Sequence, residues 1–269
     1  MRCTDNLSLG YTCFGNPDGI PLVITPGWAT DCNFLKPFVD LFPNYKVILV
    51  DMPGYGKSAH LKQFSNSTRQ SANLLLNTIP HNSILLSWSL STLVACMSCY
   101  TDTDHKIAGF ISICGSPRFP ADPNWPGFDY RYVLKSLNLF DEGRNLRSIK
   151  LFFKMQTQCN GLSKEQGQFV LDACDKMGDI DPEVLRNGLL KMAYSDYREP
   201  FFSIKIPCLH IFGAKDKLVK QELSSRMVSP PFHLSIVLQN SAHMPFLTEP
   251  EELSKAIEQF IKKLTISQK

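Results

Sequence analysis

Short, mostly apolar segments recur along the chain, and each of them ends in or close to glycine, proline or serine. The segments are PLVITPG (21–27), KVILVDMPG (46–54), SILLSWS (83–89), KIAGFISICGSP (106–117), PCLHIFGAKD (207–216) and LSIVLQNSAH (234–243). A strand without a polar face has both faces covered, which is typical of a parallel sheet between helices. Helical spacing between the segments supplies those helices, at about 30–42, 66–79, 90–100 and 250–264. The sequence therefore predicts an α/β fold: a mostly parallel sheet with helices on both faces.

Residues 118–200 interrupt this alternation. They begin with the proline-rich stretch RFPADPNWPG and continue with helical patterns only. Within them, Asp181 is expected at a helix N-cap, with Pro182 at the first helical position and Glu183 in the first turn. We expect residues 1–117 and 201–269 to form the α/β core, and residues 118–200 to form an inserted helical cap or lid.

The bulk composition favours an ordinary globular protein. The 269 residues are 43% hydrophobic and 20% charged, and the net charge of +3 is too small to indicate a nucleic-acid partner. No apolar run approaches the roughly 20 residues of a membrane span, and MRCTDNLSLGY lacks the apolar core of a signal peptide. We expect a cytoplasmic, monomeric protein that binds neither nucleic acid nor membrane.

The cysteines are expected to pack rather than to bind or react. Nine cysteines are scattered along the chain, and an odd, scattered set does not predict a disulfide framework. Most lie in apolar segments, where a thiol behaves as a small hydrophobic group. Cys96 and Cys99 have C-x-x-C spacing, but two further ligands at matching spacing do not stand nearby in the sequence. We therefore expect no metal site and no cofactor.

A candidate nucleophile lies in ILLSWSLSTLV (84–94), which reads as a buried strand that turns sharply into a helix. Ser89 is at the turn. The nucleophile elbow G-x-S-x-G places a serine hydroxyl above a sheet on such a turn. Here Ser87 and Ser91 replace both glycines, and serine is small enough to be tolerated at some cost in strain. The pentapeptide alone fits an ordinary strand–helix turn equally well.

The order of two further residues supports a catalytic role for Ser89. Hydrolases with this elbow carry serine, then an acid, then histidine along the chain. Asp216 ends one predicted strand and His243 ends the next one. The alternative role for Asp216 is a turn or helix cap beside Lys217. We predict that Ser89 is the nucleophile, Asp216 the orienting acid and His243 the general base.

Of the six histidines, only His243 combines a strand end with a following loop. His210 lies inside an apolar strand and is expected to be a hydrogen-bonded core residue. The other four fall in polar connectors and are expected to be solvated: His60, His81, His105 and His233.

An acyl-transfer site also needs donors for the developing oxyanion. The backbone N–H of Leu90, directly after the nucleophile, is one candidate. ITPGWAT supplies the other, because Gly27 permits a tight turn and Trp28 offers its backbone N–H. The Trp28 side chain either walls the pocket or packs under the cap.

The segment DMPGYGKS (51–58) ends like a phosphate-binding loop. That loop requires glycine at its first position, where Asp51 stands, so only a G-K-S tail matches. We interpret the segment as a tight turn at Pro53-Gly54 after a strand.

Together these segments resemble the α/β-hydrolase superfamily across nearly the whole chain, including its D-x-P-G-x-G-x-S motif at 51–58. Within it, the chain is most similar to the pimeloyl-[acyl-carrier protein] methyl ester esterases of biotin synthesis. The shared motifs are Gly27-Trp28, Trp88-Ser89-Leu90, Trp125-Pro126-Gly127 and Ala242-His243-Met244-Pro245-Phe246. In this chain Pro26 replaces the usual histidine, and Ser87, Ser91 and Thr92 replace elbow glycines. No catalytic side chain or oxyanion N–H is lost.

The resemblance implies a serine carboxylesterase that cleaves the methyl ester of pimeloyl-acyl carrier protein without a cofactor. It implies substrate contacts at Trp28 and Leu90 and along one cap segment: Phe152, Phe153, Lys154, Met155 and Gln156. Two alternatives stay open. One is an enzyme with the same three catalytic residues and another substrate: a broad short-chain carboxylesterase, a thioesterase or a carbon–carbon bond hydrolase. The other is a noncatalytic binding protein with the same fold.

Basic residues between 131 and 154 favour an acidic partner. Six of them stand against two acidic residues, which leaves a local charge of +4. Helical spacing places Arg144, Arg147, Lys150 and Lys154 on one helix face, and the resemblance extends this patch to Lys164. Such a basic stripe (Arg144, Arg147, Lys150, Lys154 and Lys164) would attract an acidic acyl carrier protein. The alternative is a solvated helix face.

Overall fold

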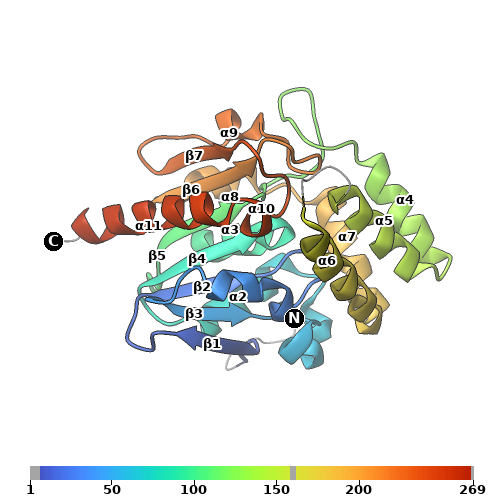
Figure 1. Cartoon of the computed structure of the whole chain (residues 1–269), viewed down its shortest axis with the longest axis horizontal. Coiled ribbons are helices and arrows are strands. Elements are labelled where there is room, and N and C mark those ends of the chain that lie inside the picture. Colours follow the sequence, from blue (N-terminus) through green and yellow to red (C-terminus); the bar gives the residue numbers. More distant parts are fainter. Residues whose placement is uncertain (1–6, 158–161, 268–269) are drawn as a thin grey trace.

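The computed structural model describes residues 7–157 and 162–267, which surround a seven-stranded sheet (Figure 1). The strands are β1 (Tyr11–Gly15), β2 (Pro21–Thr25), β3 (Lys46–Val50), β4 (Ser83–Trp88), β5 (Ile107–Ile113), β6 (Cys208–Gly213) and β7 (His233–Leu238). They lie in the order β1-β3-β2-β4-β5-β6-β7, with β1 antiparallel to β3 and every other neighbouring pair parallel. The prediction of a mostly parallel sheet is confirmed. The edge strand β1 has no wholly apolar run, and sequence reasoning missed it.

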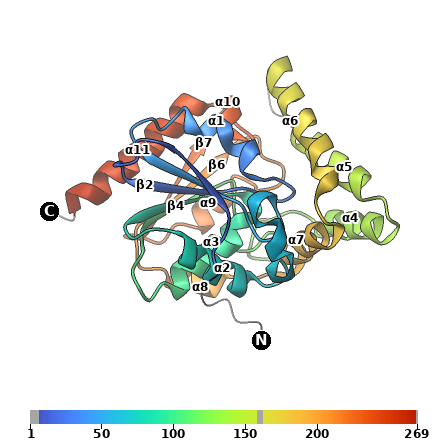
Figure 2. The ribbon, with the colours of Figure 1, turned by 90° about the horizontal axis from the view of Figure 1, so that it is seen from below.

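Helices cover both faces of the sheet, as predicted. The core helices are α1 (Lys36–Val39), α2 (Thr68–Thr78), α3 (Thr92–Thr101), α8 (Arg198–Ser203), α9 (Leu223–Arg226), α10 (Pro245–Thr248) and α11 (Pro250–Ser267). Short 3-10 turns are η1 (Cys32–Leu35), η2 (Gly56–Phe64), η3 (Ser89–Ser91) and η4 (Met177–Asp179). Helices α1, α10 and α11 lie on one face, and α2, α3 and α8 lie on the other (Figure 2). Among the described residues, no helix is both long and apolar enough to cross a bilayer.

Four helices lie together at one side of the sheet (Figure 1). They are α4 (Arg131–Asp141), α5 (Asn145–Thr157), α6 (Lys164–Lys176) and α7 (Pro182–Tyr194), and we call them the cap helices. The N-cap prediction is confirmed, because Asp181 accepts the N–H of Glu183 at 2.9 Å and Pro182 is the first residue of α7. Helix α8, at the predicted boundary near residue 200, packs against α3 of the core.

The strands form where the sequence is apolar because they are buried on both faces. All six residues of β4 and all six of β6 are buried. Burying one aliphatic side chain stabilises the fold by about 1.5–3 kcal/mol. The sheet is therefore the rigid base that holds the loops at its edge.

Two histidines lie side by side in this base. His210 Nδ1 is 2.7 Å from Ser112 Oγ, and His210 Nε2 is 3.0 Å from His233 Nδ1. The prediction that His210 is a hydrogen-bonded core residue is confirmed. The prediction that His233 is solvated is wrong, because β7 places it in the sheet and the Phe201 ring covers it at 4.5 Å. Burial lowers the pKa of both imidazoles, and it is the largest cause of each shift.

The buried histidines predict a loss of stability in acid. The unfolded chain binds protons at the ordinary histidine pKa near 6.5, whereas burial keeps His210 neutral in the folded state. Above about pH 6.5 neither state is protonated, and below it the unfolded state gains protons. We expect the free energy of unfolding to fall by about 2 kcal/mol for one fully buried histidine between pH 7 and pH 5. Urea unfolding at both pH values measures this loss, and His210→Gln should reduce it. Equal losses in the two proteins would contradict the assignment.

The seven cysteines in the described part of the chain are free thiols, and five of them are buried. Cys208 Sγ lies within 4.8 Å of the nearest nitrogens of His210 and His233, a grouping that brings together residues far apart in the sequence. Burial raises the pKa of the Cys208 thiol, and the two imidazoles already hydrogen-bond to each other. We therefore interpret the group as part of the packed core. Cys3 and Cys159 lie outside the described residues.

Candidate active site

The chain turns sharply between β4 and α3, and Ser89 is the turning residue. Strand β4 ends at Trp88, and Ser89 has a φ of 58° before the 3-10 turn begins. A positive φ is uncommon for a residue with a side chain and costs on the order of 1–3 kcal/mol. This strained conformation is the one that a nucleophile elbow requires, because it lifts the serine side chain away from both the strand and the helix.

The residues that replace the elbow glycines are held by hydrogen bonds. Ser87 Oγ and Thr92 Oγ1 lie 3.0 Å apart, and Thr25 Oγ1 donates to Ser91 Oγ at 2.9 Å. The space for Thr92 comes from Gly115, just after β5. A Cβ atom at Gly115 would lie 1.8 Å from Thr92 Oγ1, closer than any two such atoms can approach. The close approach that normally requires glycine in the elbow has therefore moved to a neighbouring strand.

Three side chains from different strand ends meet at this turn. His243 Nε2 lies 2.8 Å from Ser89 Oγ, and His243 Nδ1 lies 2.7 Å from Asp216 Oδ2. The exposed fractions of Ser89, Asp216 and His243 are 3%, 7% and 2%. The structure thus joins the three predicted residues in an unbroken line, shielded from water.

Asp216 makes the contacts of both roles that the sequence left open. Its Oδ1 accepts the N–H groups of Leu218 at 2.8 Å and Val219 at 3.1 Å, as a turn cap does. Its Oδ2 is then free for His243. The turn therefore fixes the direction of the carboxylate toward the imidazole.

Two further contacts, which sequence reasoning missed, hold the histidine loop. Trp88 Nε1 donates to the carbonyl of His243 at 2.7 Å, so the residue before Ser89 also anchors His243. Glu249 accepts the backbone N–H of Asn240 at 2.9 Å and the Ser241 hydroxyl at 2.5 Å. A glutamate shortly after the S-A-H segment is the only sequence signal for this anchor.

A buried thiol lies beside the acid. Cys114 has a φ of 46°, and its Sγ donates to the carbonyl of Ala242 at 3.3 Å. Ligand atoms of Cys114, Asp216 and His243 lie within 4.8 Å of one another. Burial, followed by the charge of Asp216, raises the pKa of this thiol well above its usual value. The thiol therefore stays protonated, and the histidine and the carboxylate are already bonded to each other.

The two candidate oxyanion donors flank Ser89. Leu90 is the second residue of η3, where a backbone N–H has no partner inside the helix. A Cβ atom at Gly27 would lie 3.1 Å from Ser89 Cβ, so the loop that leads to Trp28 runs directly against the nucleophile. The arrangement suits an anion that develops between the two N–H groups.

The Trp28 side chain packs under the cap. Its Nε1 donates to the carbonyl of Leu185 in α7 at 2.8 Å. A Cβ atom at Gly188 would lie 2.3 Å from Trp28 Cδ1, so only glycine lets α7 approach the indole this closely. A small cavity of about 40 Å³ adjoins Trp28 and Leu90, and it is also lined by Lys191. Burial lowers the pKa of Lys191 to about 8.

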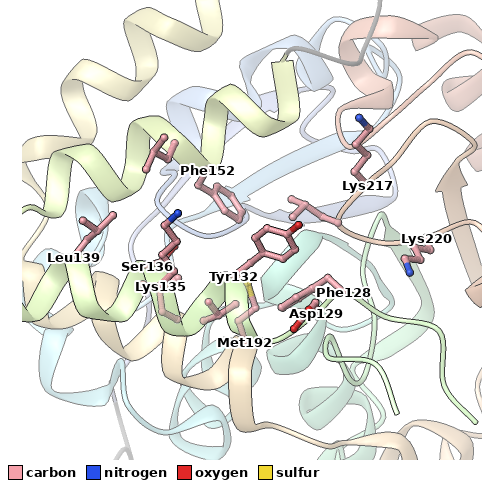
Figure 3. A pocket seen from close by; sticks show the side chains of 14 residues that line it. Phe128, Asp129, Tyr132, Lys135, Ser136, Leu139, Phe152, Met192, Lys217 and Lys220 are labelled. Carbon is pink, nitrogen blue, oxygen red and sulfur yellow. The ribbon is translucent and has the colours of Figure 1, made fainter. Parts of the chain in front are cut away.

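A larger cavity of about 490 Å³ lies between the cap helices and the loop after β6 (Figure 3). Phe152 lines it and contacts the Trp28 ring edge to face, with centroids 4.7 Å apart. The cavity therefore adjoins the residues around Ser89. The lining residues are Phe128, Asp129, Tyr132, Val133, Lys135, Ser136, Leu139, Leu151, Phe152, Leu189, Met192, Lys217, Leu218 and Lys220.

The other cap residues predicted to contact substrate are placed differently. Phe153 is 1% exposed and packs against Phe34 at 6.1 Å, whereas Lys154 is exposed to solvent. Gln156 is 3% exposed, and neither of its amide atoms has a hydrogen-bond partner within the described residues. The side chain of Met155 lies outside the described part of the chain.

The basic stripe lies on the solvent side of the cap helices. Arg144, Arg147, Lys150 and Lys164 are exposed like Lys154, and none of the five lines the larger cavity. Arg144 pairs with Glu142 at 3.3 Å, and Lys150 pairs with Asp175 at 2.9 Å.

The G-K-S tail of residues 51–58 holds the core together. Lys57 Nζ donates to the carbonyl of Tyr11 at 3.0 Å and to Thr12 Oγ1 at 2.8 Å. Ser58 Oγ donates to the carbonyl of Asp51 at 2.8 Å and accepts the N–H of Gly10 at 2.8 Å. Both polar side chains thus join β1 to the loop after β3, which agrees with the interpretation as a structural turn.

Residues 22–256 match the Alpha/beta hydrolase family. A curated relative, the pimeloyl-[acyl-carrier protein] methyl ester esterase of Yersinia enterocolitica, is 28% identical over 241 residues, which cover 89% of this chain and 92% of the relative. A hydrolase from Oleispira antarctica superposes with a TM-score of 0.81 at 19% identity, over 94% of each chain. A bromoperoxidase from Bacillus anthracis superposes with a TM-score of 0.80, also at 19% identity and over 94% of each chain. Because a hydrolase and a bromoperoxidase superpose almost equally well, these superpositions show the fold alone, and the chemistry depends on the residues of the site.

Proposed function

The chain belongs to the Alpha/beta hydrolase family, and from this premise we propose that it is a serine carboxylesterase. The observation that carries the proposal is the line of contacts from Ser89 through His243 to Asp216, at 2.8 Å and 2.7 Å. A base within hydrogen-bond reach of a serine, and itself oriented by a carboxylate, is the arrangement that activates a serine hydroxyl.

The proposed reaction has two stages. His243 Nε2 takes the proton of Ser89 as Oγ attacks the ester carbonyl, and the backbone N–H groups of Trp28 and Leu90 receive the oxyanion. Asp216 holds the Nδ1 proton of His243 and stabilises the imidazolium. His243 then gives its proton to the leaving alcohol, and an acyl-enzyme remains. Water, activated by the same base, releases the acid and restores the serine. The mechanism uses no metal or organic cofactor.

We propose the methyl ester of pimeloyl-acyl carrier protein as the substrate, so that methanol leaves and a terminal carboxylate is freed. Support comes from the curated relative, whose name specifies this ester and which matches along nearly its full length. It also comes from the larger cavity, which is mostly apolar, adjoins the candidate site and has a volume typical of ligand pockets. Phe152 would contact the acyl chain there. Phe153, Lys154, Met155 and Gln156 stay predicted contacts.

We propose that the basic stripe meets the acidic surface of the carrier. Arg147 best illustrates a basic side chain placed next to the cavity, because it is exposed on α5 one helical turn before Leu151, which lines the cavity. Opposite charges at exposed positions accelerate association more than they strengthen the complex, and salt screens them. Arg144, Lys150, Lys154 and Lys164 would widen the same field.

The test of this function is hydrolysis of the carrier-bound methyl ester. We expect the purified protein to release methanol from it, and the gene to restore growth without biotin in a strain that lacks this esterase. Reversing the charges of Arg147 and Lys150 should lower kcat/KM for the carrier-bound ester by about tenfold at low salt. Hydrolysis of p-nitrophenyl acetate is the reference reaction. A protein that cleaves this small ester but never the carrier-bound one would contradict the substrate.

A further inference from the structure

We propose that three lysines at the larger cavity, Lys135, Lys217 and Lys220, bind the phosphate of the phosphopantetheine arm through which a carrier protein presents the ester. The inference rests on the proposed function, because it takes a carrier-bound acyl ester as the substrate. It assigns to these lysines a part in substrate recognition that is separate from the basic stripe.

The cavity walls suit an acyl chain rather than a polar ligand. Most side chains that line it are apolar or aromatic: Phe128, Val133, Leu139, Leu151, Phe152, Leu189, Met192 and Leu218. A chain of methylene groups gains about 0.8 kcal/mol for each CH₂ that it buries against such walls. The cavity therefore favours the part of the substrate between the ester and the arm.

One end of the cavity is tied to the catalytic residues. Leu218 lines it, and the backbone N–H of Leu218 donates to Asp216 at 2.8 Å. Phe152 lines it as well, and its ring packs against Trp28. Ser89 itself is 3% exposed. An ester bound at Ser89 would thus extend its chain through the cavity toward solvent.

The lysines stand where such a chain would emerge. Lys135 comes from α4 and the other two from the loop after β6, so cap and core both contribute (Figure 3). All three are exposed residues of the cavity lining.

The lining of the cavity is positive overall. Among the described residues that line it, Asp129 is the only acidic one. Asp129 Oδ2 accepts Nε of Arg131 at 2.7 Å, so this carboxylate already has a cationic partner. The apolar walls match the methylene chain of the acyl group, and the cationic lining matches the phosphodiester at the far end of the phosphopantetheine arm. Lysine binds phosphate as a point charge without demanding one orientation.

The experiment compares three thioesters of monomethyl pimelate. The acyl group is attached to pantetheine, which lacks phosphate, to phosphopantetheine, or to the carrier protein. We expect the wild type to prefer phosphopantetheine over pantetheine by about tenfold in kcat/KM at low salt, which corresponds to about 1.4 kcal/mol. The double variant Lys135→Glu/Lys220→Glu should abolish that preference. Lys217 is left unchanged because it adjoins Asp216.

The controls separate phosphate binding from charge and from carrier docking. Lys255→Glu is exposed on α11 and changes the charge without touching the cavity, so the preference should persist. The Arg147 and Lys150 reversal should lower only the carrier-bound rate. A preference retained by the lysine double variant would overturn the inference. A wild type that cleaves all three equally overturns this inference alone, whereas one that cleaves none overturns the proposed function.

Discussion

Ser89→Ala is expected to reduce kcat for p-nitrophenyl acetate by on the order of 10⁴-fold or more. The variant keeps the fold and the oxyanion donors, but it removes the only oxygen that lies 2.8 Å from His243 Nε2. Without it no acyl-enzyme forms, and the residual rate is that of water attacking a bound ester. Steady-state hydrolysis, together with the loss of labelling by a fluorophosphonate, measures the effect.

Ser98→Ala is the matched control for this prediction. Ser98 is also buried, lies in the second half of α3, and donates to backbone carbonyls. It should keep kcat within about twofold, because it touches none of the reacting groups. Asp216→Asn should lose about 10⁴-fold, since an amide no longer holds the histidine in the productive tautomer. Full activity of Ser89→Ala would exclude the mechanism altogether.

Gly115→Ala is expected to damage both stability and activity, although residue 115 contacts no reacting group. The new methyl would lie 1.8 Å from Thr92 Oγ1 and 2.7 Å from Thr92 Cβ. Either the end of β5 or the start of α3 must move, and such overpacking costs about 3 kcal/mol of unfolding free energy. A shift of the nucleophile by about 1 Å would reduce kcat by on the order of 10²-fold. Urea unfolding and ester hydrolysis measure the two losses.

A rescue experiment tests whether the clash with Thr92 causes these losses. Thr92→Gly removes every atom that the new methyl meets in residue 92, and alone it should cost only about 1–2 kcal/mol, from one hydrogen bond to Ser87 and from helix propensity. The double variant Gly115→Ala/Thr92→Gly should therefore be more stable than Gly115→Ala. Thr92→Ala should rescue less, because its Cβ remains. Strictly additive losses in the double-mutant cycle would show that the two positions are not in contact.

Much of the architecture could be predicted because a strand that is buried on both faces needs a short run of apolar residues, which is visible in the sequence. The apolar runs at 46–54 and 83–89 became β3 and β4, and the capping signal at Asp181 began α7 as expected. The edge strand β1 was missed because three of its five residues are exposed, so its pattern resembles that of a polar loop. His233 was misplaced because the predicted strand began at residue 234, whereas β7 begins at His233, and because only the tertiary structure places the Phe201 ring of α8 over it.

The chain order of Ser89, Asp216 and His243 was likewise visible in the sequence, since each follows a strand and parallel strands place their carboxyl ends at one edge. The structure brings these side chains together, and their catalytic roles stay predictions until the serine is replaced. The space for Thr92 could not be foreseen, because Gly115 meets it across two strands and no spacing rule links the two positions.

The amino-acid sequence by itself determined the alternation of strand and helix, the sharp turn at residue 89 and the types of side chain available at the sheet edge. These properties depend on neighbours within one turn or one strand, where periodicity and backbone sterics act. Only the tertiary structure decided that Lys135 of the cap would face Lys217 and Lys220 of the core around one cavity, and that Gly115 would make room for Thr92. Contacts of this kind depend on how whole elements pack, and packing is set by the summed shape of many side chains that lie far apart along the chain.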